Sequence, residues 1–357
     1  MGSHVARDNV TDHRLRVLEL YSGIGGMHYA CPPDRTHVVA AVDVNTTANA
    51  VYRFNFPETQ LLQRNVQSFK QRELDGLLVD LLTMSPPCQP FTRQGLRRDT
   101  QDPRSSSFLS LIQVLPTLKH PPRYILLENV KGFESSSTCA VYLDVLSKCG
   151  YHFHRYLLSP TQFGVPNSRL RFYCLAKRGQ FSDCPDACDR ICENLPTAQW
   201  QPTPLSNFLE GDIDSTRQYN LPDGILSKFA FILDIVDRDS TQTCCFTKGY
   251  GHYVEGTGSV LLQNSHDMLD DVYRDVPPRV ASEGVLPASV IERLRELRLR
   301  YFTPLEVSRL MCFPEQFEFP REMTSRQQYQ LLGNSVNVRV VRELLQHLLN
   351  DDRSQQE

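Results

Sequence analysis

The stretch that decides the fold is LLVDLLTMSPPCQPFT, residues 77–92. Its aliphatic residues on consecutive positions predict a strand that is covered on both faces. Ser85, Pro86 and Pro87 follow as a stiff extended segment, because each proline fixes its own φ and biases the preceding residue toward extended backbone. Cys88 comes next, at the carboxyl edge of the predicted sheet, where open α/β sheets bind ligands. This position favours a nucleophile over an inert buried thiol.

Other apolar runs alternate with helix-like segments up to Arg178, which is typical of a parallel sheet wrapped by helices. Strands are expected at 15–21, 37–44, 76–84, 123–129, 151–158 and 169–177, and helices at 46–56, 136–150, 286–302 and 336–349. The fold class is therefore α/β, with a doubly wound, mostly parallel sheet. The pattern becomes irregular and rich in proline after Gly179. We expect a catalytic domain over 14–180 plus 325–350, and a smaller domain with connecting helices over 181–324.

The composition limits the class of protein. A chain of 357 residues is long for one hydrophobic core. The 11 cysteines lack the dense spacing of a disulfide scaffold and favour free thiols in a reducing compartment. No metal site is expected, since Cys184, Cys188 and Cys192 supply only three ligands and no CxxC pair. The absence of a long apolar run or an apolar leader favours an intracellular protein without membrane spans. The net charge of −3 argues against a general polyanion binder, but leaves room for a local basic surface.

A glycine turn follows the first expected strand, in ELYSGIGGMHYA, residues 19–30. Its glycines allow a tight turn and a close approach to a ligand. The dinucleotide fingerprint requires a further glycine where His28 stands. Asp43 ends the second strand, where an acid can bond ribose hydroxyls. These features suit an adenosine-type cofactor without a pyrophosphate, although a turn that only needs positive φ would look the same.

Charged residues mark two more strand ends. Glu128 ends an aliphatic strand, where partial desolvation can raise a carboxyl pKa until the group donates a proton. Arg169 and Arg171 lie two apart on a strand, so they point to the same face and suit phosphate, carboxylate or a base carbonyl. The alternatives are an ordinary strand-end acid paired with a cation, and two solvated arginines at a sheet edge.

Taken together, these motifs resemble those of a known family. SPPCQPF, ENV, the glycine turn and LLGNSVNVRVV at 331–341 are similar, in this order, to the motifs of the pyrimidine carbon-5 methyltransferases, the DNA cytosine methylase family. The resemblance covers 15–178 and 326–349. It is nearest to the small tRNA-modifying branch, on the basis of CFTKGYGHYVEGTGSV at 245–260, RYFTP at 300–304 and the lack of a long regulatory N-terminus.

The resemblance implies a Rossmann-like, S-adenosylmethionine-dependent fold with a second domain that recognises the target. S-adenosylmethionine is the implied cofactor, and its implied binding residues are Tyr21, Ile24, Gly25, Gly26, Asp43, Val66, Gln67, Ser85 and Ser335. Asp43 would bond the ribose, Val66 and Gln67 would flank the adenine, and Ser335 would close the pocket. Many relatives carry an acid near Gln67, and this chain has none there.

The family chemistry implies four catalytic residues: Cys88, Glu128, Arg169 and Arg171. Cys88 would add to carbon 6 of a flipped-out cytosine, while Glu128 protonates or bonds the ring nitrogen. Arg169 would hold the base carbonyl and lower the cysteine pKa, with Arg171 in support. Asn167 stands where the family usually has glutamine.

The implied reaction is methylation of carbon 5 of a cytosine in the anticodon loop of tRNA, with aspartate tRNA as the first candidate. Substrate contacts are expected from Arg93, Arg97, Arg98 and Arg104 after the nucleophile, and from Lys248 and His252. A solvated charged loop is the alternative for the arginines. We expect a monomer in the cytoplasm, and also in the nucleus, with DNA as a weaker partner. Competing interpretations are a DNA cytosine-5 methyltransferase and a non-catalytic nucleic-acid-binding protein of the same fold; an NAD-type oxidoreductase is disfavoured by His28.

Overall fold

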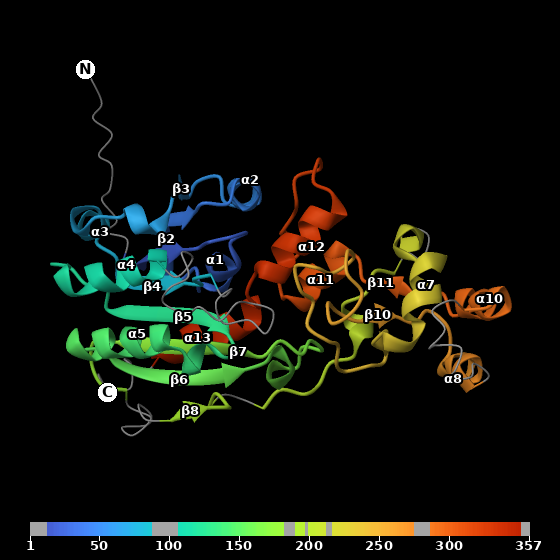
Figure 1. Ribbon diagram of the computed structural model, residues 1–357. Helices are drawn as coiled ribbons and strands as arrows, with labels where there is room; N and C mark the ends of the chain where they lie inside the picture. The colour runs from blue at the N-terminus through green and yellow to red at the C-terminus, as the bar shows by residue number, and fades with distance from the viewer. Residues whose placement is uncertain are drawn as a thin grey trace, which may run out of the picture.

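A computed structural model describes residues 13–87, 106–181, 190–196, 199–211, 216–274 and 286–350. Its main sheet has eight strands in the order β3-β2-β1-β4-β5-β7-β6-β8 (Figure 1). The strands are β1 (Leu15–Leu20), β2 (Thr36–Asp43), β3 (Gln60–Gln63), β4 (Leu81–Met84), β5 (Tyr124–Val130), β6 (His152–Leu158), β7 (Arg171–Lys177) and β8 (Ile191–Cys192). The first five pair in parallel, and β7 is antiparallel to both β5 and β6. The α/β class with a mostly parallel sheet is therefore confirmed.

Helices cover both faces of this sheet (Figure 1). One face carries α1 (Gly26–Ala30), α2 (Thr46–Asn55) and α13 (Val338–Asn350), and the other carries α3 (Gln71–Leu77), α4 (Ser106–Val114) and α5 (Ser137–Lys148). The apolar residues of α13 recur at helical spacing and are fully buried. Arg35 also donates to the carbonyl of Leu349 at 2.7 Å. The end of the described chain thus packs as an integral layer of the sheet domain.

A second, three-stranded sheet lies beside the first in the order β11-β10-β9 (Figure 1). Its strands are β9 (Ile235–Val236), β10 (Val260–Leu261) and β11 (Arg300–Tyr301), and the helices in this part are α7 (Asp223–Phe229), α8 (His266–Arg274), α10 (Ala288–Glu296), α11 (Pro304–Leu310) and α12 (Ser325–Asn334). Figure 1 shows α11 and α12 between the two sheets. The expected domain boundaries remain a prediction.

Two expected elements were too long. The helix expected at 286–302 ends at Glu296, because Arg298 adopts a left-handed φ of 51° and Arg300 then pairs in β11. The strand expected at 76–84 begins only at Leu81, since Leu78 has a φ of 47° and caps α3. In both cases one backbone reversal, which an apolar run does not reveal, divides the segment.

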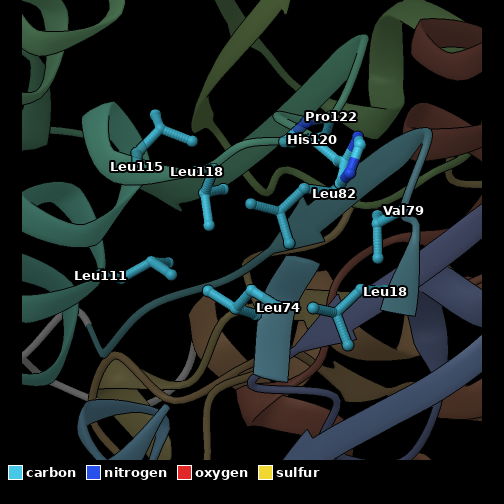
Figure 2. Close-up of a pocket in the computed structure, with 9 residues that line it drawn as sticks. All are labelled: Leu18, Leu74, Val79, Leu82, Leu111, Leu115, Leu118, His120 and Pro122. Atoms are coloured by element: carbon cyan, nitrogen blue, oxygen red, sulfur yellow. The ribbon is translucent and has the colours of Figure 1, made fainter. Parts of the chain in front are cut away.

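A hollow of about 360 Å³, counting its open mouth, lies between α3, α4 and the sheet (Figure 2). It is lined by Leu18, Leu74, Val79, Leu82, Leu111, Leu115, Leu118, His120 and Pro122. Val79 precedes β4 and Pro122 precedes β5, so the hollow reaches the amino ends of the strands. It lies away from the carboxyl edge, and its lining is almost entirely apolar.

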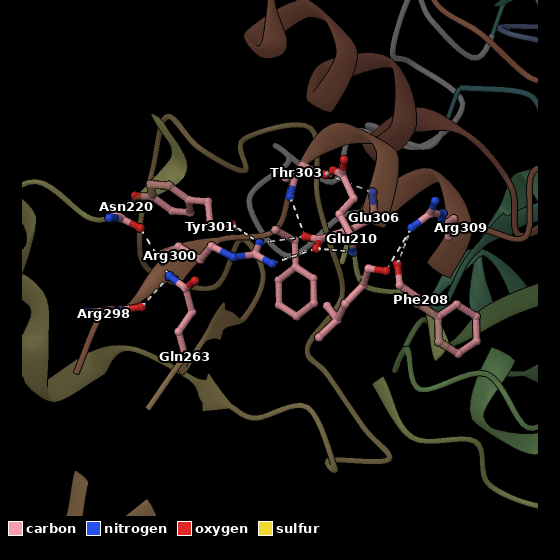
Figure 3. Close-up of polar contacts among 12 residues, drawn as sticks. Phe208, Glu210, Asn220, Gln263, Arg298, Arg300, Tyr301, Thr303, Glu306 and Arg309 are labelled. Carbon is pink, nitrogen blue, oxygen red and sulfur yellow. Dashed lines mark hydrogen bonds and ion pairs between the residues drawn. The ribbon is translucent and has the colours of Figure 1, made fainter. Parts of the chain in front are cut away.

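A buried ion pair joins the second sheet to α11 (Figure 3). The guanidinium of Arg300 donates to both carboxylate oxygens of Glu306 at 2.7 Å, and both side chains are almost fully buried. Glu306 also accepts from the backbone N–H groups of Thr303 at 2.9 Å and Glu210 at 3.0 Å. The donors come from β11, from the N-cap of α11 and from Glu210, which is 96 positions away, so the pair fixes how β11 leads into α11.

We predict that Glu306→Ala strongly destabilises the protein, because it leaves the Arg300 guanidinium buried without its counter-charge. Loss of one partner of a buried pair costs about 3–5 kcal/mol of unfolding free energy. The exposed Glu315, replaced in the same way, should change it by less than about 0.5 kcal/mol. Urea unfolding of both variants measures this difference, and equal midpoints would refute the structural role of Glu306.

Candidate active site

Four strand ends meet at the carboxyl edge of the main sheet. Tyr21 follows β1, Asp43 ends β2, Ser85 follows β4, and Glu128 lies near the end of β5. The hydroxyl of Ser85 donates to the carbonyl of Tyr21 at 3.2 Å, which ties two of these ends together. The structure therefore gathers at one edge the residues that the sequence placed at separate strand ends.

The glycine turn after β1 has the backbone that its sequence requires. Gly23 and Gly25 have φ values of 53° and 85°, which favour glycine. The N–H of Gly23 donates to the carboxylate of Asp43 at 2.9 Å. A Cβ on Gly26 would lie 2.8 Å from the hydroxyl oxygen of Ser335, so these two residues pack directly together. The C-terminal segment thus packs on the turn, and the cofactor role expected of Ser335 stays a prediction.

Three features at this edge fit an adenosine-type cofactor. The buried hydroxyl of Ser22 has no hydrogen-bond partner within the described residues. A Cβ built on Gly23 meets no atom within 4 Å, so there is open space beside the turn. Val44, which the sequence interpretation missed, is 67% exposed next to Asp43 and offers an apolar surface. Its only signal in the sequence is its position directly after the strand-end acid.

The remaining expected cofactor residues differ in accessibility. Ile24 and Val66 bury their side chains in the core, whereas Gln67 is exposed. The Tyr21 hydroxyl lies 3.1 Å from that of Ser107 at the start of α4, and Gln67 also contacts this helix through Ser106. Tyr21 and Gln67 are thus held near each other, whereas Ile24 and Val66 pack into the separate apolar cores of the two faces of the sheet.

Glu128 is a buried carboxyl group beside one arginine. Its Oε1 lies 3.5 Å from Nε of Arg171. Desolvation raises the pKa of Glu128 above its usual value, although the charges of Arg171 and Arg169 oppose this shift. The next residue, Asn129, donates from its side chain to the carbonyl of Pro86 at 3.3 Å. This bond joins the ENV segment to the PPC segment; Cys88 itself lies outside the described residues.

Arg169 lies deeper and has different partners. Its guanidinium donates to the carbonyls of Phe246 at 3.3 Å and Gly333 at 3.1 Å, and also to the carbonyl of Ser335. It lies 3.5 Å from the sulfur of Cys245. The two arginines, expected to act on one face, therefore divide their contacts: Arg171 faces Glu128, and Arg169 binds backbone from two distant segments.

Cys245 is a second thiol at this site, to which the sequence interpretation gave no role beyond family recognition. Its sulfur lies 3.5 Å from Nη1 of Arg169 and 3.9 Å from Nη2 of Arg171. Burial opposes ionisation of the thiol, but the two guanidinium charges outweigh burial and lower the Cys245 pKa below its usual value. Cys245 lies 74 positions after Arg171 and 76 after Arg169, so spacing along the chain could not have revealed these contacts.

The expected substrate residues are only partly described. Arg93, Arg97, Arg98 and Arg104 lie outside the described residues. Lys248 and His252 are exposed, and His252 lies 3.4 Å from Arg326 on α12. Asn167 is fully buried, and neither atom of its amide has a partner in the described part of the chain.

Within the described ranges, no group of three or more His, Cys, Asp or Glu residues is arranged to hold a metal ion. In the same ranges, no helix is long and apolar enough to cross a membrane.

A buried polar cluster lies beneath the glycine turn. The hydroxyl of Tyr52 donates to Glu19 at 2.8 Å and lies 2.8 Å from Nδ1 of His28. The His28 ring stacks on Phe56 at 3.7 Å, and a Cβ on Gly25 would lie 2.3 Å from the Phe56 ring. Desolvation raises the pKa of Glu19 to about 8 and lowers that of His28 to about 4. Both groups are therefore neutral near pH 7, and the turn rests on an uncharged support.

The eight-stranded sheet, its glycine turn and the buried acid at its carboxyl edge define a cytosine carbon-5 methyltransferase fold. Residues 15–350 match the model of the C-5 cytosine-specific DNA methylase family. The chain belongs to this family.

Within the family, the chain falls in the Dnmt2 branch. It is 42% identical to the tRNA (cytosine(38)-C(5))-methyltransferase of Homo sapiens, over 94% of this chain and 99% of that protein. A mutant of the Spodoptera frugiperda Dnmt2 protein has a similar crystal structure, with a TM-score of 0.83 and 43% identity over 94% of this chain and 99% of that chain. The Schizosaccharomyces pombe Dnmt2 methyltransferase gives a TM-score of 0.78 and 37% identity over 94% and 98% of the two chains.

The Glu19 cluster predicts a specific dependence of stability on pH. Folded Glu19 keeps its proton up to about pH 8, whereas the unfolded chain releases it near 4.5, so the unfolding free energy falls as pH rises between these values. His28 has the opposite effect, but only between about 4 and its ordinary value of 6.5. Between pH 6.5 and 8 the Glu19 effect therefore remains, at up to about 1.4 kcal/mol per pH unit.

Glu19→Gln should remove the fall in unfolding free energy that Glu19 causes between pH 6.5 and 8. The exposed Glu58→Gln should retain it. Denaturant unfolding at half-unit pH steps measures the difference between each variant and the wild type. A difference for Glu19→Gln that does not change between pH 6.5 and 8 would show that Glu19 is already ionised in the folded protein.

Proposed function

We propose that the protein transfers a methyl group from S-adenosylmethionine to carbon 5 of a cytosine in tRNA, with the anticodon-loop cytosine of aspartate tRNA as the first candidate. The observation that carries this proposal is the bond from Asn129 to Pro86, which joins the buried carboxyl segment to the segment that leads into Cys88. Relatives about 42% identical, including those of Homo sapiens and Bos taurus, are named tRNA (cytosine(38)-C(5))-methyltransferase.

The proposed reaction uses Cys88 and Glu128 together. Two residues of chain span at most about 7 Å, so the Cα of Cys88 is bound to lie within about that distance of the Cα of Pro86. Carbon 5 of cytosine is a poor nucleophile until the Cys88 thiolate bonds to carbon 6 and its electron pair moves into the ring. Glu128 supplies a proton or hydrogen bond to the ring nitrogen, which its raised pKa permits. Carbon 5 then bonds the methyl group that the cofactor would supply. A base removes the carbon-5 proton, and the electron pair of that C–H bond expels the Cys88 thiolate, which releases the methylated ring.

The cofactor supplies the methyl group when it is bound. Of the residues that would hold it, Asp43 provides a carboxylate for the ribose and Val44 an apolar surface for the adenine ring. Gly26 and Ser335, which pack together, would enclose it from the side of the C-terminal segment. Tyr21 and Ser85, which follow the paired strands β1 and β4 and share a hydrogen bond, would position the end that carries the methyl group.

The arginines take different parts in this proposal. Arg171 is the arginine within 3.5 Å of Glu128, so it is the better placed to bond the carbonyl of a base held there. Arg169 acts indirectly, because its guanidinium donates to the carbonyls of Phe246, Gly333 and Ser335. This differs from the sequence interpretation, which gave the base carbonyl to Arg169.

A DNA substrate is the second candidate. A Dictyostelium discoideum relative, 37% identical over 94% of this chain, is named DNA (cytosine-5)-methyltransferase. Both polymers offer phosphates and a cytosine, but a loop cytosine costs less to flip out than one stacked in a duplex. With tRNA as substrate, the protein would work as a monomer in the cytoplasm, and also in the nucleus.

The substrate is tested by incubation with labelled S-adenosylmethionine and either total small RNA or duplex DNA. We expect label in tRNA, at one cytosine of the anticodon loop, with little in DNA. Mapping the modified nucleotide in purified aspartate tRNA then tests the narrower assignment. Preferential labelling of DNA would rule out tRNA as the main substrate.

The catalytic acid is tested by Glu128→Gln, which keeps the shape of the side chain but cannot donate the acidic proton. We expect kcat to fall by about 10²- to 10⁴-fold, because a positioned general acid contributes that factor. Glu134→Gln, six residues along the same segment, should retain activity. Initial rates with tRNA measure both, and a kcat for Glu128→Gln within threefold of the wild type would refute the role of Glu128.

A further inference from the structure

Tyr253 is a large aromatic side chain left open to solvent close to the active site. Its side chain is 64% exposed, in a part of the chain whose other aromatic residues, Phe246 and Tyr250, are buried. Exposed aromatic side chains on otherwise ordered loops are typical of surfaces that bind unpaired nucleobases. Packing within the fold therefore does not explain why the Tyr253 side chain lies at the surface.

The loop that presents Tyr253 is held by its own hydrogen bonds. The N–H of Thr247 donates to the carbonyl of Thr257 at 2.9 Å, and the hydroxyl of Thr257 donates to the carbonyl of Tyr253 at 2.7 Å. The N–H of Tyr253 itself donates to Gly249 at 2.9 Å. A Cβ on Gly251 would lie 3.0 Å from the ring of Tyr329, so the loop also packs closely on α12. The exposed ring is thus pre-positioned, and binding through it would cost little ordering.

Basic side chains lie on the same loop and beside it. The His252 ring lies 4.5 Å from that of Tyr253 in an edge-to-face arrangement. Nε2 of His252 is 3.4 Å from the guanidinium of Arg326, and Lys248 is exposed on the same loop. Glu255 is the one acid between residues 247 and 257. An aromatic face on a loop that also carries Lys248, next to Arg326, suits a base with its flanking phosphates better than an apolar protein segment.

A chain of direct contacts connects Tyr253 to the catalytic groups. The Gly333 carbonyl accepts from Arg169 at 3.1 Å, and a Cβ on Gly333 would lie 2.2 Å from the backbone nitrogen of Lys248. A Cβ on the next residue, Gly249, would lie 3.1 Å from the Tyr253 ring. The ring is therefore within a few nucleotides' reach of a cytosine held at Glu128.

We propose that Tyr253 is a stacking platform for an unpaired base that neighbours the target cytosine in the RNA loop, with Lys248, His252 and Arg326 contacting the adjoining phosphates. The proposal rests on the proposed function and deepens it. Because a stacked platform requires a second unpaired base, Tyr253 makes the enzyme select a cytosine within a loop over an isolated bulged one. Stacking on an aromatic ring tolerates different bases, so this selects the shape of the loop more than its sequence.

The first test compares Tyr253→Ala, Tyr253→Phe and Tyr253→Trp in steady-state methylation of tRNA. We expect KM for tRNA to rise about 5- to 100-fold in Tyr253→Ala, in line with the loss of one stacked base, while kcat stays within about twofold. The phenylalanine and tryptophan variants should retain the wild-type KM, because stacking needs the ring and not the hydroxyl. Phe231→Ala removes another exposed aromatic residue, and should change neither constant.

The second test identifies the base, using tRNA that carries one abasic nucleotide at each loop position in turn. At one position, the abasic change should raise KM for the wild type and have no further effect on Tyr253→Ala, because both changes remove the same contact. A KM for Tyr253→Ala within twofold of the wild type would overturn the proposal. The exposed ring would then be better explained as a contact for a protein partner. Equal losses in the alanine and phenylalanine variants, or the absence of any such loop position, would overturn it as well.

Failure of the proposed function would be visible separately. A wild-type protein that labels no tRNA contradicts the proposed function before any variant is compared. The stacking proposal is then tested by equilibrium binding of the same tRNA. Equal affinities of wild type and Tyr253→Ala would overturn it, and a weaker affinity for the alanine variant alone would support it.

Discussion

The buried guanidinium of Arg169 is the group on which the assembly of the site depends. It stands just before β7 and donates to the carbonyls of Phe246, Gly333 and Ser335, which lie 77, 164 and 166 positions away along the chain. A buried cation that lost these acceptors would be costly, so the three segments are stabilised in this arrangement together. The main sheet, the loop that carries Cys245 and the end of α12 thereby meet at one point.

Two glycines allow these segments to pack closely against one another. Gly333 leaves no room for a side chain against the backbone of Lys248, and Gly26 leaves none against Ser335. Larger residues at these positions would separate the second sheet from the first, or the C-terminal segment from the glycine turn. The contacts of Arg169 and these close approaches therefore depend on each other, although they involve different parts of the chain.

Much of this arrangement could be predicted from the sequence, because it depends on local patterns. Consecutive aliphatic residues marked most strands of the main sheet, and the polar residues after them correctly indicated the edge where Tyr21, Asp43 and Glu128 meet. The features that the sequence did not predict depend on contacts between residues far apart in the chain. The thiol of Cys245 reaches the arginines only through the tertiary fold, and the different partners of Arg169 and Arg171 do not follow from their spacing of two.

The electrostatic balance of the site explains why the pKa of a thiol is lowered there. Arg169 and Arg171 carry two positive charges, and Glu128 is the one carboxyl group that the described residues place beside them, with a pKa that burial raises. The excess is positive, in a region where burial limits screening by water. Cys245 responds to it directly, because its thiol pKa is lowered despite burial. The two guanidinium charges beside a buried acid whose pKa is raised therefore make a positive environment, which favours a thiolate nucleophile near Glu128.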